Sequence, residues 1–270
     1  MLTMIRGAGD IASGVALRLR RAGFDVVMTE IERPTTIRRT VAFSDAIVNG
    51  EQTVEDVTAL RAETWEEACL YLERGSIPVL VDPDCACRAQ LKPDALVDAI
   101  LAKRNLGTAI TDAPVVVGVG PGFTAGVDCH AVVETMRGHT LGRAYYEGSA
   151  LPNTNIPGLI GGFAGERVLR APADGTFQSA HRIGDLVEAG EPVGFVAGMP
   201  MTATISGVLR GLLADGVRVK KGMKSGDVDP RGEKEYCDLV SDKALAVAGG
   251  VLEAILHFSA KNAAGGNYGE

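Results

Sequence analysis

The sequence has no excess of basic residues, and this absence bears on its partners. Its 27 Lys and Arg residues are outnumbered by 34 Asp and Glu, for a formal net charge of −7 at pH 7. Proteins that bind nucleic acid or anionic membranes over a broad surface carry the opposite charge. We therefore expect no nucleic-acid partner and no membrane partner, while a small local anion site is compatible with this balance.

Long apolar runs and a disulfide framework are also missing. The longest apolar stretches, such as 113–119, are far shorter than the roughly 20 residues that cross a bilayer. The chain opens directly on a strand-like segment, so we expect no secretory leader. Five cysteines, an odd number spread over 270 residues, are typical of reduced thiols. These absences predict a cytoplasmic globular protein.

A glycine-rich turn near the start of the chain is the strongest motif. It reads Gly7-x-Gly9-x-x-Ala12, between a short apolar segment and a helical pattern over 15–21. The first glycine permits a tight turn, the second lets a pyrophosphate approach the backbone, and the alanine allows close packing. A helix N-terminus attracts anions. We predict a Rossmann-like unit in which Gly7, Gly9 and Asp10 hold phosphate; the alternative is a turn that binds nothing.

The strand after this helix ends in an acid and is followed by arginines. Glu30 lies 21 residues after Gly9, near the spacing at which Rossmann units place the acid that binds a ribose. We expect Glu30 to accept a ribose or pterin hydrogen bond. Arg33, Arg38 and Arg39 come next, and guanidinium forks suit phosphate or carboxylate. We expect Arg38 and Arg39 to contact a ligand charge, with a solvated helix face as the alternative.

A second strand and glycine-rich turn occur near the middle of the chain. The β-rich run 113–119 leads into Gly120, Gly122 and Thr124, and we expect a helix over 128–137. Parallel strands end at one edge of their sheet, so the two glycine turns can converge on one ligand. We therefore expect Gly120, Gly122 and Thr124 to form the second wall of the site.

Several ionisable residues of this second unit are candidate catalytic residues. His130 and Glu134 are four apart and would share a face of the expected helix. Cys129 would lie at its N-terminus, where a thiol becomes more reactive. We take Cys129, His130 and His139 as candidate catalytic residues, with an ordinary cap and an i,i+4 pair as the alternative. We assign no metal ligands, because the one Cys-x-Cys pair has no second pair of ligands.

The second half of the chain contains an internal repeat with an offset of 32 residues. The matching pairs are Gly175 and Gly207, Gly184 and Gly216, Gly190 and Gly222, Gly194 and Gly226, and Val187 and Val219. Turn pairs between short β-type runs predict two interlocking β-hairpin motifs around a pseudo-two-fold axis. This half resembles the biotinyl/lipoyl-like barrel-sandwich domains. The hairpin 198–202 lacks their cofactor-bearing lysine, so we expect a binding or docking module.

These patterns predict an α/β fold in four parts. They are a Rossmann-like parallel-sheet domain that binds a nucleotide or cofactor (1–165), a two-repeat barrel-sandwich domain (166–232), a C-terminal helix packing back on the first domain (233–258), and a flexible tail (259–270). Gly249-Gly250 are costly inside a helix, so we expect another backbone to pack closely against them. A further helix is expected over 93–104.

Several motifs, spread from Ile5 to Leu256, carry a family resemblance. They are the segments 6–14, 29–32, 37–43, 119–128, 134–139, 146–153, 229–232 and 249–253. In this order they resemble the YqeB proteins, which are accessory proteins of selenium-dependent molybdenum hydroxylase systems. The first turn also resembles the Rossmann part of the XdhC factors, which insert or mature the molybdenum cofactor of xanthine dehydrogenase.

The resemblance implies a maturation factor that binds molybdopterin or its nucleotide form. It implies a molybdenum hydroxylase apo-enzyme, or other maturation proteins, as partners, and Cys129 would then carry sulfur or selenium. Two other functions fit the motifs. One is an NAD(P)-dependent oxidoreductase acting on a small molecule, with His130 or His139 as acid and base. The other is a non-enzymatic scaffold whose β-repeat docks the hydroxylase. The sequence leaves catalysis itself and assembly into a homo-oligomer undecided.

Overall fold

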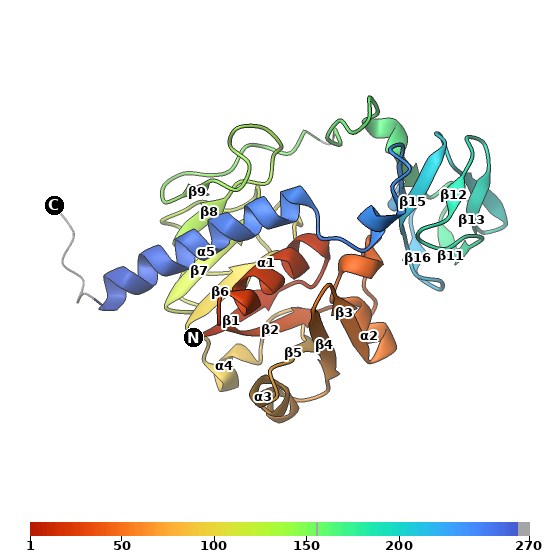
Figure 1. Cartoon of the computed structure of the whole chain (residues 1–270). Helices are drawn as coiled ribbons and strands as arrows, with labels where there is room; N and C mark the ends of the chain where they lie inside the picture. The colour runs from red at the N-terminus through yellow and green to blue at the C-terminus, as the bar shows by residue number, and fades with distance from the viewer. Residues whose placement is uncertain (155, 264–270) are drawn as a thin grey trace.

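The computed structural model describes residues 1–154 and 156–263. Within these residues the chain forms one nine-stranded sheet and two four-stranded antiparallel sheets (Figure 1). The two small sheets lie together at the end of the molecule where the long C-terminal helix begins. The chain is therefore a mixed α/β protein with a parallel-sheet core, additional antiparallel sheets and a C-terminal helix.

The large sheet has the strand order β3-β4-β5-β2-β1-β6-β7-β8-β9. Its strands are β1 (Leu2–Arg6), β2 (Asp25–Glu30), β3 (Glu51–Val54), β4 (Val57–Ala62), β5 (Ile77–Val81), β6 (Ala95–Asp98), β7 (Val115–Val119), β8 (Ala131–Val133) and β9 (Ala144–Tyr145). All neighbours from β4 to β8 pair in parallel, and the edge strands β3 and β9 are antiparallel. Strands that are covered on both faces read as continuous apolar runs, as in the wholly buried β7.

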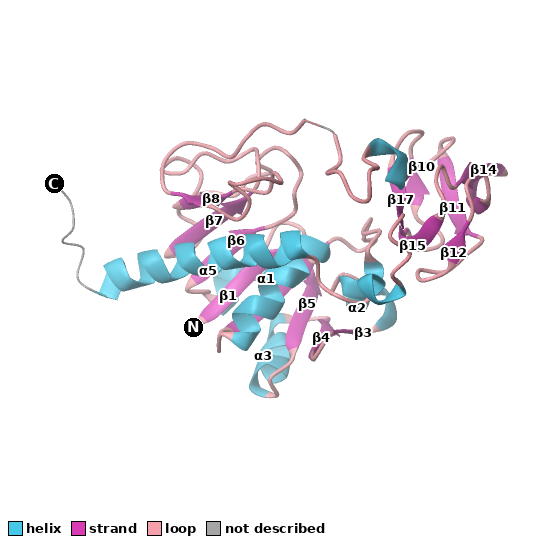
Figure 2. Ribbon diagram, turned by 45° about the horizontal axis from the view of Figure 1, so that its top comes forward, coloured by secondary structure: helices cyan, strands magenta, loops and turns pink. Residues whose placement is uncertain are grey.

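Helices cover both faces of this sheet. The helices are α1 (Asp10–Arg21), α2 (Asp45–Asn49), α3 (Trp65–Glu73), α4 (Arg88–Leu91) and α5 (Asp242–Ala263), with single 3-10 turns at Arg39–Val41, Gly165–Arg167 and Lys234–Cys237. α1 and α5 lie side by side over one face (Figure 2), and α3 packs from the other. Thr64 caps α3 by accepting a hydrogen bond from the Glu67 N–H at 3.3 Å.

Two glycines let α5 approach its neighbours closely. A Cβ built on Gly14 of α1 would lie 2.7 Å from the Cβ of Ala244, and one on Gly250 would lie 2.0 Å from the carbonyl oxygen of Gly142. At Gly249, by contrast, no described residue lies within 4 Å of the Cβ position. Close backbone contact therefore explains Gly250 but not Gly249.

Helix α5 is apolar and continues further than the sequence indicated. It runs to Ala263, so the expected tail over 259–270 begins as helix, and 264–270 lie outside the described residues. By length and composition alone the segment Asp242–Ala260 could cross a membrane. In the structure it contributes Val247, Val251 and Ile255 to the core above the sheet, which is the role of a core helix in soluble proteins.

Two expected helices are strands in the structure. The range 93–104 contains β6, and 128–137 contains β8. Short apolar runs do not distinguish a buried strand from a buried helix by their period. In both places the run is only three or four residues long and lies buried within the sheet, so pairing with neighbouring strands decides the outcome.

The repeat forms two equivalent sheets. Their strand orders are β10-β17-β15-β12 and β14-β13-β11-β16. The strands are β10 (Val168–Arg170), β11 (Gly175–Ser179), β12 (Leu186–Val187), β13 (Pro192–Val196), β14 (Met199–Thr202), β15 (Gly207–Leu212), β16 (Arg218–Val219) and β17 (Lys224–Asp229). Gly175 pairs with Val219, and Gly207 pairs with Val187, so each repeat donates a strand to the other. The 32-residue offset thus describes a two-fold arrangement around the buried Phe177 and Leu209.

Candidate functional site

A cavity of about 480 Å³ lies at the carboxyl edge of the parallel sheet. Its wall includes four residues that the sequence predicted together, namely Gly7, Gly9, Asp10 and Glu30. The repeated module closes the opposite side with Met223 and Lys224. The cavity lies where β1 has β2 on one side and β6 on the other, which is the place where an open parallel sheet leaves a crevice.

The backbone conformation and the surroundings of Gly7 differ from those of Gly9. Gly7 has φ of +97°, and a Cβ on it would lie 3.2 Å from the backbone of Ala99 and Ile100. Gly9 has an ordinary φ of −67°, and a Cβ there would meet only Thr36 Oγ1, at 3.5 Å. The fold therefore requires Gly7, whereas Gly9 keeps the wall of the cavity open to a ligand.

The N-terminus of α1 presents its backbone N–H groups at this cavity. Gly9 is the N-cap and supplies no side-chain hydrogen bond, so the amides of the first turn lack a protein cap. The Ser13 hydroxyl is engaged elsewhere, donating to the carbonyl of Ala8 at 3.1 Å and accepting from the N–H of Phe43 at 2.8 Å. The turn is thus held rigidly while the positive end of the helix stays available to an anion.

Glu30 lines the cavity and also braces the glycine turn. Its Oε2 accepts a hydrogen bond from the Ala8 N–H at 2.9 Å, and its Oε1 accepts one from the Ile31 N–H at 2.8 Å. Burial raises the pKa of Glu30, and the two backbone N–H groups oppose that shift. The carboxylate is therefore fixed in orientation, with lone pairs remaining for a ligand donor.

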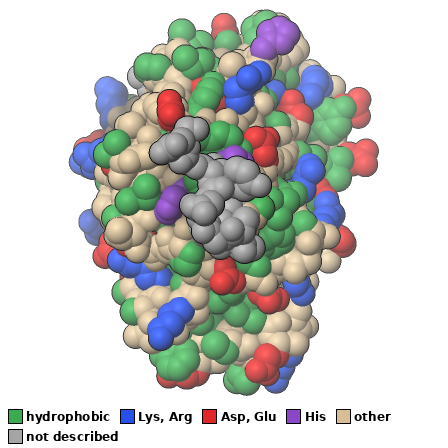
Figure 3. Space-filling model, turned by 90° about the vertical axis from the view of Figure 1, so that its left-hand side faces the viewer, with side chains coloured by type: hydrophobic (Ala, Val, Ile, Leu, Met, Phe, Trp, Pro, Cys, Tyr) green, Lys and Arg blue, Asp and Glu red, His purple; other side chains and the backbone are tan. Residues whose placement is uncertain are grey.

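Three lysines surround the carboxyl edge. Lys224 lines the first cavity, and Lys103 and Lys243 line a neighbouring cavity of about 380 Å³. Burial lowers the pKa of both Lys103 and Lys243; Lys224 lowers that of Lys103 further, and Lys103 that of Lys243. Among the described residues none of the three forms an ion pair. The three lysines therefore bring positive charge to this edge without forming ion pairs, beside the Asp10 and Glu30 carboxylates of the first cavity, and Asp10 attracts Lys243. Basic and acidic side chains are interspersed at the opposite end of the molecule (Figure 3).

Arg38 and Arg39 lie away from this cavity. Arg39 donates to the carbonyl of Leu212 at 2.9 Å and pairs with Asp45 at 3.3 Å. Arg38 donates to the carbonyls of Tyr236 and Leu239. Both side chains thus fasten the sheet to later parts of the chain, and the structure does not bring them to a ligand beside Gly9.

The second glycine turn lies near the same edge but serves packing. A Cβ on Gly122 would lie 2.6 Å from the backbone of Arg104, and one on Gly120 would lie 3.0 Å from Thr135 Oγ1. The Thr124 N–H donates to Asp128 at 2.8 Å. None of these predicted second-wall residues lines the 480 Å³ cavity.

The three candidate catalytic residues are not brought together with the cavity. Cys129 precedes β8, is fully buried, and has a pKa raised to about 11 by burial. The His130 Nδ1 accepts from the Val116 N–H at 2.9 Å, and burial lowers its pKa. His139 is exposed on a separate surface. The premise of a helix N-terminus that activates Cys129 is wrong, because β8 replaces that helix.

Sequence reasoning missed the basic residues of the site. Lys103 follows β6, Lys224 begins β17 and Lys243 lies in the first turn of α5, so their convergence depends on contacts between distant segments. No local pattern marks them. Within the part of the chain that the structure describes, no group of three His, Cys, Asp or Glu side chains is arranged to hold a metal ion.

Fold and site together define an α/β protein with a cavity at the carboxyl edge of its parallel sheet, beside a helix N-terminus and Lys224. No family model matches the chain. The chain is 55% identical over 255 residues to the "Uncharacterized protein YqeB" of Escherichia coli (strain K12). The match covers 94% of this chain and 47% of that protein, so the chain spans about half the length of its curated relative. This identity supports the YqeB family label that the motifs indicated.

Solved structures offer only distant likenesses. An aspartoacylase family protein from Mesorhizobium loti is 18% identical over 23% of this chain and 22% of its own, with a TM-score of 0.22. A succinylglutamatedesuccinylase/aspartoacylase from Rhodobacter sphaeroides is 24% identical over 24% of this chain and 22% of its own, also with a TM-score of 0.22. At this TM-score neither carries an argument about fold or function.

Proposed function

We propose that this chain is an accessory factor in the maturation of a molybdenum hydroxylase, and that it binds molybdopterin or its nucleotide form at the carboxyl edge of the sheet. The cavity carries the proposal, because an open wall at Gly9, an uncapped helix N-terminus and the unpaired Lys224 all favour phosphate. Lys103 and Lys243 in the neighbouring cavity add positive charge that offsets the Asp10 carboxylate of this wall. The motifs shared with the YqeB proteins supply the link to molybdenum hydroxylases.

The sheet order supports a Rossmann-like assignment of the first part. Six neighbouring strands of the sheet lie in the order β5-β2-β1-β6-β7-β8, which is the strand order of a doubly wound dinucleotide-binding sheet. In such sheets the glycine turn after the first strand lies where the strand order reverses. The two interlocking sheets of the repeat likewise support the barrel-sandwich assignment. In our proposal this module both closes the cavity through Lys224 and docks the target enzyme.

The residues at the cavity fit a phosphate-bearing pterin. The amides at the start of α1 and the Lys224 ammonium would hold the phosphate group. Ile37, Ile100 and Leu101 provide apolar surface for a ring, and the Glu30 carboxylate would accept a ring or ribose hydrogen bond. The volume lies within the range of small-ligand sites, about 300–1,000 Å³. The cofactor supplies the redox chemistry of the target enzyme, and these residues bind and orient it.

A second candidate function is binding of NAD(P) by an oxidoreductase. Glu30 at the end of β2 favours it, because that position in dinucleotide-binding sheets contacts the ribose. The remote positions of His130 and His139 argue against them as its acid and base. This candidate therefore shares the binding site with the first and lacks an evident catalytic group.

Calorimetric titration of the purified protein with molybdopterin, its cytidine dinucleotide, NAD and NADP tests the proposal. We expect binding of a pterin ligand with at least about tenfold preference over NAD and NADP, equal to about 1.4 kcal/mol. Tight binding of NAD or NADP without pterin binding would favour the oxidoreductase. Absence of heat with all four ligands would remove both functions.

A further inference from the structure

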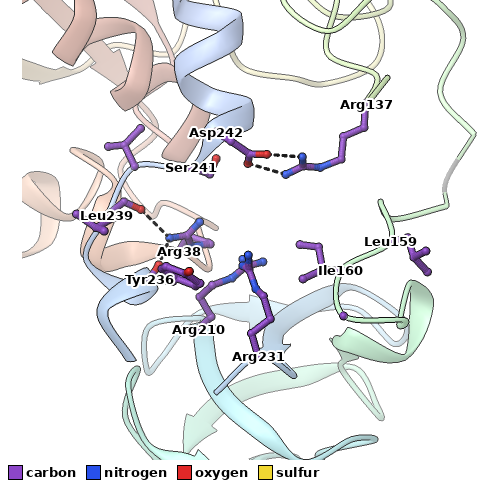
Figure 4. Close-up of a pocket in the computed structure, with 12 residues that line it drawn as sticks. Arg38, Arg137, Leu159, Ile160, Arg210, Arg231, Tyr236, Leu239, Ser241 and Asp242 are labelled. Carbon is purple, nitrogen blue, oxygen red and sulfur yellow. Dashed lines mark hydrogen bonds and ion pairs between the residues drawn. The ribbon is translucent and has the colours of Figure 1, made fainter. Parts of the chain in front are cut away.

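A second cavity, of about 430 Å³, lies between the parallel-sheet part and the repeated module (Figure 4). Four arginines line it: Arg38 and Arg137 from the first part, and Arg210 and Arg231 from the module. Asp242 is the one acidic residue among the described residues of its wall. The guanidinium groups of Arg38, Arg210 and Arg231 gather on one side of the opening in the close-up, with the Arg137–Asp242 pair across from them.

Two buried aspartates lie behind this wall and neutralise part of its charge. Arg210 bonds to both, with Nε 2.9 Å from Asp227 Oδ2 and Nη1 2.9 Å from Asp229 Oδ2. Arg231 donates to Asp229 at 2.6 Å, and Arg167 donates to Asp227 at 2.9 Å. Both carboxylates are thus shared between arginines, and of the remaining wall Asp227 attracts Arg38 without forming an ion pair with it.

Arg137 has its own ion-pair partner, whereas Arg38 forms no ion pair among the residues that the structure describes. Arg137 makes a bidentate pair with Asp242, at 2.7 and 2.9 Å. Five arginines, counting Arg167 behind the wall, therefore outnumber by two the three aspartates that form ion pairs with them. The more remote Asp10, which attracts Arg38, reduces this excess in part. A phosphate monoester carries about −1.5 to −2 charges at neutral pH, so one such group matches the excess.

Arg38 is the residue that points most directly to a missing anion. The residue is only 7% exposed, and among the described residues it forms no ion pair, although Asp10 and Asp227 attract it electrostatically. Nη2 donates to the carbonyls of Tyr236 at 2.9 Å and Leu239 at 3.2 Å, while the buried Nε has no hydrogen-bond partner. Burial and the neighbouring Arg210 lower the pKa of Arg38, and the attraction of Asp10 and Asp227 offsets this only in part. An anion in this cavity would therefore stabilise the buried guanidinium.

We propose that this arginine cavity is a second ligand site, which binds the phosphate group of a small organic phosphate. Guanidinium forks match phosphate oxygens in pairs, and α5 begins at the cavity wall with Ser241 and Asp242. Ile160, Tyr236 and Leu239 provide apolar surface for the organic part. The site is separate from the carboxyl-edge cavity, because the described linings of the two cavities have no residue in common.

Calorimetry with inorganic phosphate and with glycerol 3-phosphate, at constant ionic strength, tests this site. Wild type is expected to bind the ester at least as tightly as inorganic phosphate. Arg38→Gln keeps amide donors for the two carbonyls but removes the charge, and it should weaken ester binding at least tenfold. Arg231→Gln should do the same, and since the Arg231 side chain is 41% exposed, this variant keeps the test valid if the first does not fold.

Two control variants separate this site from the surface and from the carboxyl-edge cavity. Arg33 is exposed and lines neither cavity, so Arg33→Gln should bind the ester as wild type does. Lys224→Gln should also retain ester binding at the arginine cavity. Unchanged affinity in both Arg38→Gln and Arg231→Gln would overturn the proposal, as would binding of inorganic phosphate with exclusion of the ester. Loss of binding in Lys224→Gln alone would also overturn it, while leaving the proposed function standing.

Discussion

The carboxylate of Glu30 accepts a hydrogen bond from the backbone N–H of Ala8 at 2.9 Å. This contact joins the end of β2 to the glycine turn after β1. The second carboxylate oxygen accepts from the N–H of Ile31 at 2.8 Å, so each oxygen accepts one backbone donor and keeps a lone pair for a ligand. Glu30 thereby sets the shape of the cavity edge before any ligand arrives.

Replacing Glu30 by glutamine should destabilise the protein and alter its pH dependence. Glutamine offers one acceptor oxygen to two N–H donors, so we expect a loss of about 1–3 kcal/mol. Burial raises the folded pKa of Glu30 above its unfolded value. Its contribution to stability is therefore largest in acid and falls as pH rises from the unfolded pKa, about 4.3, through the raised folded pKa. Urea unfolding between about pH 4 and 7 measures this fall, and an identical pH profile for Glu30→Gln would contradict it.

The adjacent glycines of α5 should respond oppositely to alanine. A Cβ on Gly250 would lie 2.0 Å from the Gly142 carbonyl oxygen, whereas no neighbour lies within 4 Å of one on Gly249. We expect Gly250→Ala to destabilise by about 1–3 kcal/mol, as overpacking does. Gly249→Ala should stabilise by about 1 kcal/mol through helix propensity. Chemical denaturation of both variants checks the pair, and equal effects would refute the packing described here.

The pair of Arg137 and Asp242 should contribute to stability in a pH-dependent way. The hydrogen bonds from Arg137 lower the pKa of Asp242 to about 2. Because the folded pKa is depressed, the contribution is present above the unfolded value of about 3.9 and is lost as pH falls toward 2. The Asp242 side chain is 73% exposed, so the effect should be small and should shrink in salt. Thermal unfolding at low salt measures this effect: as pH falls toward 2, the melting temperature of Arg137→Gln should decrease less than that of wild type.

The thiol of Cys129 should be inert in the folded protein. It is fully buried with a pKa raised to about 11, and the thiolate is the reactive form. Iodoacetamide labelling followed by mass spectrometry should modify the half-buried Cys69 well before Cys129. Rapid native labelling of Cys129 would contradict the structure and would revive the role of sulfur or selenium carrier.

Local patterns were sufficient to predict the glycine turn and the repeat. The order of strand, Gly7-x-Gly9 turn and helix depends on neighbours in sequence, and the repeat is visible through its constant offset. The strand β8 was mistaken for a helix, because its three residues carry no period and only pairing with β7 defines it. The sequence also does not indicate where a side chain points. Arg38 was expected at a ligand, but its side chain donates to the carbonyl of Tyr236.

The basic residues of both cavities depend on long-range packing. Lys224 reaches the first cavity only because the repeated module closes over the sheet edge. Lys243 reaches the neighbouring cavity because α5 begins beside it. Arg210 and Arg231 meet Arg38 across the same junction. These contacts between distant residues cannot be predicted from spacing in the sequence, because they depend on how the sheet and the module pack against each other.

Titration of molybdopterin cytidine dinucleotide into wild type, Gly9→Ala and the control Gly249→Ala tests the central claim most directly. Gly9 has an ordinary φ of −67°, which alanine can adopt. Alanine is a weaker N-cap, which lowers the stability of the protein by about 0.5–1 kcal/mol. It also reduces the conformational entropy of the unfolded chain, which raises the stability by about 0.4–1 kcal/mol. The fold should therefore survive, while the new methyl group occupies the wall where the phosphate approaches. We predict at least about tenfold weaker binding by Gly9→Ala and unchanged binding by Gly249→Ala. Equal affinity in all three proteins would contradict a ligand site at this turn.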